Sequence, residues 1–140
     1  MIYADTSFFV SIYVVDRHWD AADKLVRSDP RVWFTPLHFA EFTHAVSQHV
    51  FRGLMDGPQA DQVRRVLAAD RSAGLWTDVA WPEHAFDLCA ELGRRHGPKF
   101  GARTLDSLHV ACALELKAER FWTFDERQLK LARAEGLRTS

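Results

Sequence analysis

The sequence predicts an α/β domain with a mostly parallel sheet of four or five strands. Short β-rich segments alternate along the chain with longer segments whose apolar residues recur at helical spacing. Such an alternation is typical of a parallel sheet that helices cover on both faces. A length of 140 residues suits one domain, and neither an internal repeat nor a linker-like segment divides it. Residues 1–140 are therefore expected to form a single domain.

The first half of the chain is expected to hold two strands and four helices. The apolar stripe formed by Phe39, Phe42, Val46 and Val50 marks a long helix, and Pro36 suits its first turn. The expected elements are a strand at 1–4, helices at 7–15 and from Trp19 to the Asp29–Pro30 stop, a strand at 32–35, and helices from Pro36 to Gly53 and from Ala60 to about Gly74.

The second half is expected to hold two further strands and three helices, with a possible short strand at the end. Thr104 suits the N-cap of one of these helices. The segment from Gly93 to Gly101 contains several Gly and Arg residues and is expected to be a connection. The expected elements are strands at 75–80 and 120–124, helices from Pro82 to Leu92, at 105–116 and at 126–134, and a final strand at 137–139.

Composition excludes several classes of protein. Apolar residues make up 47% and charged residues 26%, which is typical of a globular chain rather than a disordered one. No apolar run reaches the roughly 18 residues that cross a bilayer. The start, MIYADTSFFV, has no basic residue before its apolar stretch, so a secretory signal is not expected and the location is expected to be cytoplasmic. Cys89 and Cys112 lie in apolar helical patterns and are expected to be buried, reduced thiols.

Four acidic residues stand among apolar neighbours: Asp5, Glu41, Asp106 and Asp125. Asp5 and Asp125 directly follow predicted strands, where α/β sheets bind ligands. Taken singly, Asp106 can favour a helix N-terminus, Asp125 can cap a helix, and Glu41 can be half-exposed. Taken together, carboxylates drawn into one place repel one another unless a hard cation holds them, so the pattern suggests a Mg²⁺ or Mn²⁺ site.

These segments resemble the PIN domain family, and within it the VapC-type toxin ribonucleases of bacterial and archaeal toxin–antitoxin pairs. The resemblance covers the whole chain and implies a PIN-like three-layer α/β/α sandwich. It also implies metal-dependent hydrolysis of RNA phosphodiester bonds. The matching segments are Asp5-Thr6-Ser7, Ala40-Glu41, Asp106-Ser107-Leu108-His109-Val110-Ala111 and Thr123-Phe124-Asp125-Glu126-Arg127.

The resemblance implies a role for each of these residues. Asp5 and Asp106 would bind Mg²⁺ or Mn²⁺ directly, and Glu41 and Asp125 would bind it directly or through water. All four would form the catalytic set. The hydroxyl groups that would orient these carboxylates or a bound water belong to Thr6, Ser7 and Thr123.

A basic run without acids precedes Asp106. As a charge run it can be a solvated helix end, and beside an acidic site it can be a rim that attracts RNA phosphates. The second interpretation is preferred because an acidic site must still attract an anionic substrate. The expected RNA-binding residues are Arg94, Arg95, Lys99 and Arg103, with His96 inside the run.

Three functions of different classes stay open. The first is a toxin endoribonuclease restrained by a cognate antitoxin, and the family also implies a homodimer. The second is a housekeeping RNA-processing PIN nuclease, and the third is a non-catalytic PIN module that binds RNA or protein. A remote alternative is a di-iron carboxylate protein, because His44 and His109 follow Glu41 and Asp106 by three residues. The strand-rich pattern disfavours that bundle.

Overall fold

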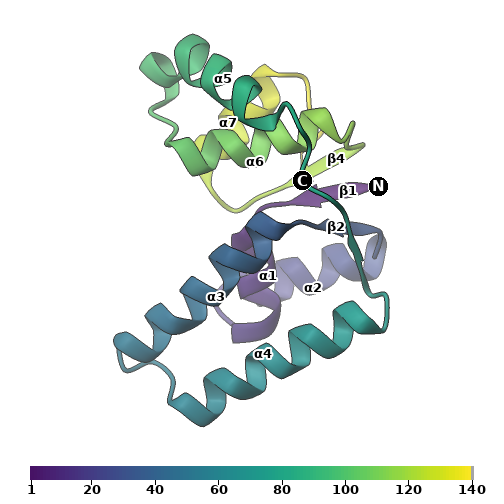
Figure 1. The fold of residues 1–140 in the computed structure, drawn as a ribbon, viewed down its shortest axis with the longest axis vertical. Helices are drawn as coiled ribbons and strands as arrows, with labels where there is room; N and C mark the ends of the chain where they lie inside the picture. Colours follow the sequence, from purple (N-terminus) through teal and green to yellow (C-terminus); the bar gives the residue numbers. More distant parts are fainter. Residues whose placement is uncertain (140) are drawn as a thin grey trace. The chain divides into compact units, whose positions relative to one another are not determined.

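The computed structural model describes residues 1–139, which form two compact units (Figure 1). One unit comprises residues 1–5 and the chain from Ala80 onward, and the other comprises Thr6–Val79. In the described residues the elements are β1 (Ile2–Ala4), α1 (Thr6–Val14), α2 (Trp19–Ser28), β2 (Val32–Phe34), α3 (Pro36–Phe51), α4 (Gly57–Ser72), β3 (Trp76–Asp78), α5 (Ala85–Phe100), α6 (Thr104–Glu115), β4 (Arg120–Trp122) and α7 (Glu126–Ala134).

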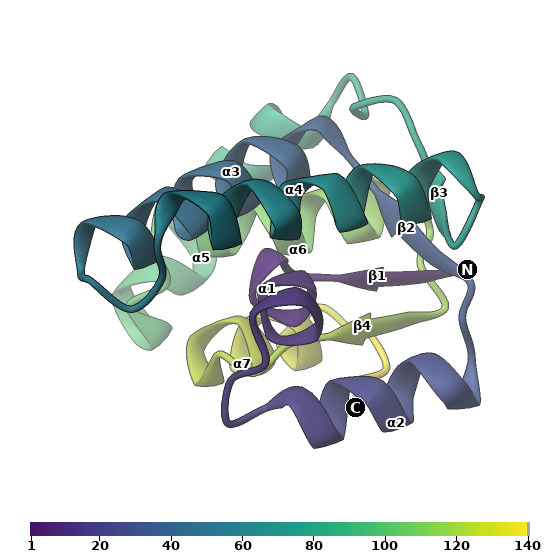
Figure 2. The same cartoon turned by 90° about the horizontal axis from the view of Figure 1, so that it is seen from below.

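The first unit is built on the parallel pair β1 and β4, which lie side by side in Figure 2. Tyr3 is opposite Phe121 in the register. Helix α5 packs against α6, and α7 contacts both. The expected final strand is reduced to one parallel bridge between Thr139 and Phe121. The fully buried apolar side chains of this unit include Ile2, Tyr3, Leu92, Val110, Phe121 and Leu131.

The second unit is built on the parallel pair β2 and β3. Helix α1 contacts α2, α3 and α4, and α3 also packs against α4. The core is aromatic: the Phe9 ring meets Phe34 and Trp76 edge-on, with centroids 5.1 and 5.2 Å apart. Edge-to-face pairs of this kind add to the stabilisation that burial provides.

Most predicted elements are confirmed, and the strands are shorter than expected, at three residues each. The predicted connection from Gly93 to Gly101 is wrong, because α5 continues to Phe100 and ends at Gly101, which has φ 63°. Gly93 and Gly97 each weaken a helix by about 1 kcal/mol relative to Ala. Packing of α5 on α6 outweighs that cost, so the basic residues of this segment lie on a helix.

The helix starts follow ordinary capping chemistry. Thr35 caps α3 and Asp56 caps α4, each with a reciprocal side-chain bond three residues on. Thr104, the expected N-cap of α6, is instead its first residue, because Arg103 has the extended backbone of the cap. None of the helices within residues 1–139 is long and apolar enough to cross a membrane.

Both cysteines are buried free thiols, as predicted. Burial raises the pKa of the Cys112 thiol to about 12, so this group stays protonated at neutral pH.

A partly buried polar link joins α1, α4 and β3 in the second unit. The Tyr13 hydroxyl donates to Asp70 Oδ2 at 2.6 Å and accepts from Trp76 Nε1 at 2.5 Å. Burial, followed by the bond to Asp70, raises the pKa of Tyr13 far above its ordinary value. The hydroxyl is therefore a permanent donor at any physiological pH.

We expect Tyr13→Phe to lower the free energy of unfolding by about 1–3 kcal/mol, because it leaves two polar groups without their partner. Urea unfolding followed by tryptophan fluorescence measures this change. Ser72→Ala, at an exposed position at the end of α4, is the control and should change stability by less than about 0.5 kcal/mol. Equal stability of the Tyr13→Phe variant and the wild type would contradict a structural role for this link.

Candidate active site

Asp5 lies at the carboxyl end of β1, one residue beyond the strand. Its backbone N–H donates to Trp122 O at 2.9 Å, which continues the pairing with β4 by one step. The side chain is only 2% exposed. Because β1 and β4 are parallel, the residues that follow both strands meet at the same edge.

Thr123, the residue after β4, holds Asp5 from the side. Its Oγ1 donates to Asp5 Oδ2 at 3.0 Å and accepts from the Asp125 backbone N–H at 3.0 Å. The resemblance implied only that this hydroxyl orients one of the carboxylates or a bound water, and the structure identifies Asp5 as its acceptor. The two strand ends are therefore joined by one threonine.

Asp125 performs the capping role that its position suggested. Its Oδ1 accepts from the backbone N–H groups of Arg127 and Gln128, at 2.8 and 3.1 Å, at the start of α7. Its Oδ2 lies 3.7 Å from the Arg127 guanidinium. Oδ1 therefore caps the helix, whereas Oδ2 takes no part in the cap and lies near the Arg127 side chain.

Asp106 lies in the first turn of α6 and is 5% exposed. Its Oδ2 accepts from the Arg103 backbone N–H at 2.9 Å and lies 3.5 Å from Arg103 Nε. Its Oδ1 accepts from Gln128 Nε2 at 3.4 Å. Both carboxylate oxygens are therefore held in place.

Gln128 is a residue of this cluster that sequence analysis did not identify. It is 6% exposed, and its Oε1 lies 3.5 Å from the Thr123 hydroxyl. The signal in the sequence was its place on the face of α7 that also carries the buried Leu131 and Ala132. A polar residue on a buried helix face requires a hydrogen-bond partner. Here the partners are Thr123 and Asp106.

The second unit holds the remaining predicted residues. Thr6 Oγ1 donates to Glu41 Oε2 at 2.5 Å, and Thr6 follows Asp5 directly in the chain. Glu41 faces a pocket of about 330 Å³. Asp16, an acid that sequence analysis did not select, also lines it and accepts from Ser11 Oγ at 3.0 Å. The residues around this pocket are Thr6, Ser7, Val10, Asp16, Glu41 and Ala45.

Within residues 1–139, no group of three or more His, Cys, Asp or Glu side chains is arranged to hold a metal ion. The first unit does link two carboxylates through Thr123 and Gln128, and their chemistry suits a hard cation. Asp5 and Asp106 offer buried carboxylate oxygens. Mg²⁺ commonly binds through one or two carboxylates and completes its shell with water and substrate phosphate.

The histidines do not support a di-iron site. The Nδ1 atom of His109 lies 2.9 Å from the Tyr3 hydroxyl, in the buried core of the first unit. His44 is exposed on α3. A di-iron carboxylate site needs inward-facing Glu-x-x-His pairs on bundled helices.

The residues of the basic run differ in their partners and in their exposure. Arg95 pairs with Glu91 at 3.2 Å and with Glu135 at 3.0 Å, and His96 Nε2 lies 2.6 Å from the same Glu135 oxygen. Arg103 lies beside Asp106. Arg94 and Lys99 are exposed on α5 and are the members best able to reach a ligand.

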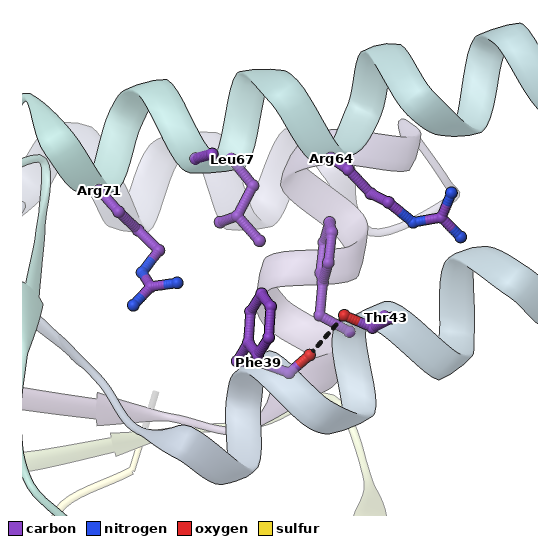
Figure 3. Close-up of a pocket in the computed structure, with 7 residues that line it drawn as sticks. Phe39, Thr43, Arg64, Leu67 and Arg71 are labelled. Carbon is purple, nitrogen blue, oxygen red and sulfur yellow. Dashed lines mark hydrogen bonds between the residues drawn. The ribbon is translucent and has the colours of Figure 1, made fainter.

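An apolar pocket of about 180 Å³ lies between α3 and α4 (Figure 3). Phe39, 53% exposed, forms part of its wall, with Arg64 and Arg71 on the opposite helix. Phe8 of α1 takes no part in this pocket, because its side chain is fully buried in the core.

Comparison with known proteins identifies the fold. The PIN domain model matches residues 2–134. The structure of VapC20 from Mycobacterium tuberculosis, titled a Sarcin-Ricin loop cleaving toxin, is similar with a TM-score of 0.72 and 17% identity over 98% of this chain and 96% of that one. No significant match is found among curated proteins.

Two further solved structures have the same fold. FitAcB from Neisseria gonorrhoeae has a TM-score of 0.68 and 17% identity, covering 99% of this chain and 96% of that one. VapBC2 from Rickettsia felis, solved bound to a DNA fragment from their promoter, has a TM-score of 0.70 and 18% identity, covering 100% and 98%. The predicted α/β fold class is confirmed, and the chain belongs to the PIN domain family.

Proposed function

We propose that this protein is a metal-dependent endoribonuclease and the toxin of a toxin–antitoxin pair, folded as a single PIN domain over residues 1–140. The observation that carries the proposal is the position of Thr123, whose hydroxyl donates to the Asp5 carboxylate and accepts from the Asp125 backbone N–H. The similarity in fold to VapC20, titled a toxin that cleaves the Sarcin-Ricin loop, supports the assignment.

The proposed roles follow from the carboxylates. Asp5 and Asp106 would hold a Mg²⁺ or Mn²⁺ ion directly, and Glu41 and Asp125, the latter through Oδ2, would hold it directly or through water. The ion, when bound, lowers the pKa of a water and offsets the charge of the phosphate. A carboxylate of the set accepts the proton from the attacking water.

The hydroxyl groups keep these acids in place. Thr123 orients Asp5, and Thr6 orients Glu41. Ser7, on the rim of the pocket beside Glu41, is proposed to hold a water there. None of these hydroxyls has to act as a nucleophile, because water attacks the phosphorus.

The first test replaces a proposed metal ligand. Asp5→Asn should abolish cleavage of structured RNA in Mg²⁺ or Mn²⁺, while the amide oxygen can still accept from Thr123. The metal-free thermal unfolding temperature should be at least as high as in the wild type, because a negative charge that is only 2% exposed is removed.

Asp87→Asn, an exposed acid in the first turn of α5, is the matched control and should keep activity. Cleavage assays with Mg²⁺, with Mn²⁺ and with EDTA separate metal dependence from contamination. Full activity of Asp5→Asn in EDTA would overturn the metal-dependent mechanism.

The second test concerns the exposed members of the basic run. We expect the double variant Arg94→Gln/Lys99→Gln to weaken RNA binding and to flatten its salt dependence. The slope of log K against log salt should fall by about 0.7 for each phosphate that is no longer neutralised by a side chain. Arg95→Gln should affect stability more than binding, because Arg95 is paired with Glu91 and Glu135.

Lys24→Gln/Arg52→Gln removes the same charge from exposed positions elsewhere and is the control. Filter binding of a labelled RNA over a salt series measures the slope. A slope equal in all variants would show that Arg94 and Lys99 are only a solvated surface.

The third test concerns the antitoxin. We propose that an amphipathic helix of the antitoxin docks an apolar side chain against Phe39 in the pocket between α3 and α4. Co-expression with the product of the neighbouring upstream gene should relieve toxicity and yield a stable complex. Phe39→Asp should weaken that complex and leave RNA cleavage intact.

Phe51→Asp is the control, since Phe51 is 86% exposed on the same helix but does not line the pocket. Harmless expression, intact RNA and no co-purifying neighbour would favour a housekeeping nuclease or a non-catalytic PIN module instead. Size-exclusion chromatography of the same samples tests the homodimer.

A further inference from the structure

We propose that Gln128 is a positioning residue that couples the two carboxylates Asp5 and Asp106 and sets the affinity of the site for its metal ion. The inference rests on the proposed metal-dependent function and assigns a role to a residue outside the four acids.

The contacts of Gln128 span the two halves of the cluster. Its Nε2 donates to Asp106 Oδ1 at 3.4 Å, and its Oε1 lies 3.5 Å from Thr123 Oγ1. Thr123 in turn contacts Asp5 at 3.0 Å. The single Thr123 proton has Asp5 Oδ2 as its near acceptor and Gln128 Oε1 as a second, longer one. Asp5 and Asp106 are therefore linked through two neutral side chains, Thr123 and Gln128.

The chemistry of an amide suits this place. It donates at one end, accepts at the other and carries no charge at any physiological pH. A Glu side chain would bring a further negative charge to Asp106, and an apolar side chain would leave Asp106 Oδ1 without its donor. Only an amide of this length meets both neighbours without adding charge.

The backbone of Gln128 is fixed by the same cluster. Its N–H donates to Asp125 Oδ1 at 3.1 Å, and Leu131 and Ala132 on the same helix face are fully buried. Gln128 as a whole is 6% exposed, so its side chain has little room to move. Asp106 is thus held at Oδ2 by Arg103 and at Oδ1 by Gln128.

The expected consequence is an effect on metal affinity rather than on folding. Partners that orient metal-binding carboxylates typically change affinity by about 10–100-fold when they are removed. Loss of the amide would leave Asp106 held only at Oδ2 by Arg103, and an ion that binds would then have to order Oδ1 without help.

The experiment compares Mn²⁺ binding, measured by calorimetric titration, in two variants of the full chain. Gln128→Met keeps the length and loses the amide, whereas Gln128→Asn keeps the amide and loses the length. Both should bind Mn²⁺ at least about tenfold more weakly than the wild type. Gln62→Met, at an exposed glutamine of α4, is the control and should bind normally.

A double-mutant comparison tests whether Gln128 and Thr123 act together on Mn²⁺ affinity. If Gln128 acts through Thr123, the losses caused by Gln128→Met and Thr123→Val should be less than additive in the double variant. Metal-free thermal unfolding and circular dichroism check that each variant is folded. If Gln128→Met does not fold, Gln128→Asn still tests the inference, because it keeps a polar side chain at this position.

The outcomes separate this inference from the proposed function. Wild-type affinity in Gln128→Met, with weakened binding in Asp5→Asn, would overturn the role of Gln128 alone. Absence of Mn²⁺ binding in the wild type would overturn both. Weakened binding in both Gln128 variants with a normal Gln62→Met would support the inference.

Discussion

Two buried carboxylates that are joined through neutral groups constrain much of the first unit. Asp5 and Asp106 are 2% and 5% exposed, and a buried charge is costly unless donors solvate it. Those donors are a threonine hydroxyl, a glutamine amide and the backbone N–H of Arg103. The two carboxylates therefore require hydrogen-bond donors at three places: Thr123 after β4, Gln128 in the first turn of α7, and Arg103 at the start of α6.

Helix starts and the candidate site share the same atoms. Asp106 accepts from the backbone three residues before it at the beginning of α6, and Asp125 caps α7. An acid at a helix N-terminus also gains from the helix dipole. Backbone N–H groups at the starts of α6 and α7 thus stabilise the carboxylates of Asp106 and Asp125. Fewer side chains are then needed to hold these two acids in place.

The fold was predictable where local pattern decides the structure. The bounds of α7 follow from the Asp125 cap and the apolar spacing, and the long stripe of α3 fixed that helix. The extension of α5 through Gly93 was not predictable, because packing against α6 outweighs local propensity. Arg95 was interpreted as a free cation because Glu135 is 40 residues away in the chain.

The acids of the candidate site could be selected from the sequence, but the residues that hold Asp5 and Asp106 in place could not all be predicted. A carboxylate among apolar neighbours is conspicuous, as at Asp5 and Asp106. Gln128 is not conspicuous, because glutamine is ordinary on any amphipathic helix and only the tertiary structure shows its buried face. Asp16 likewise resembles a simple break between helices until the pocket beside Glu41 is seen.

The cap at Asp125 has an evolutionary consequence. Asparagine caps a helix about as well as aspartate does, and a single base change converts one codon into the other. A lineage can therefore discard the negative charge at this strand edge while α7 still starts at the same residue. Natural descendants of this chain can therefore lose the Asp125 charge and stay well folded, so thermal stability alone does not reveal which of them retain the acid.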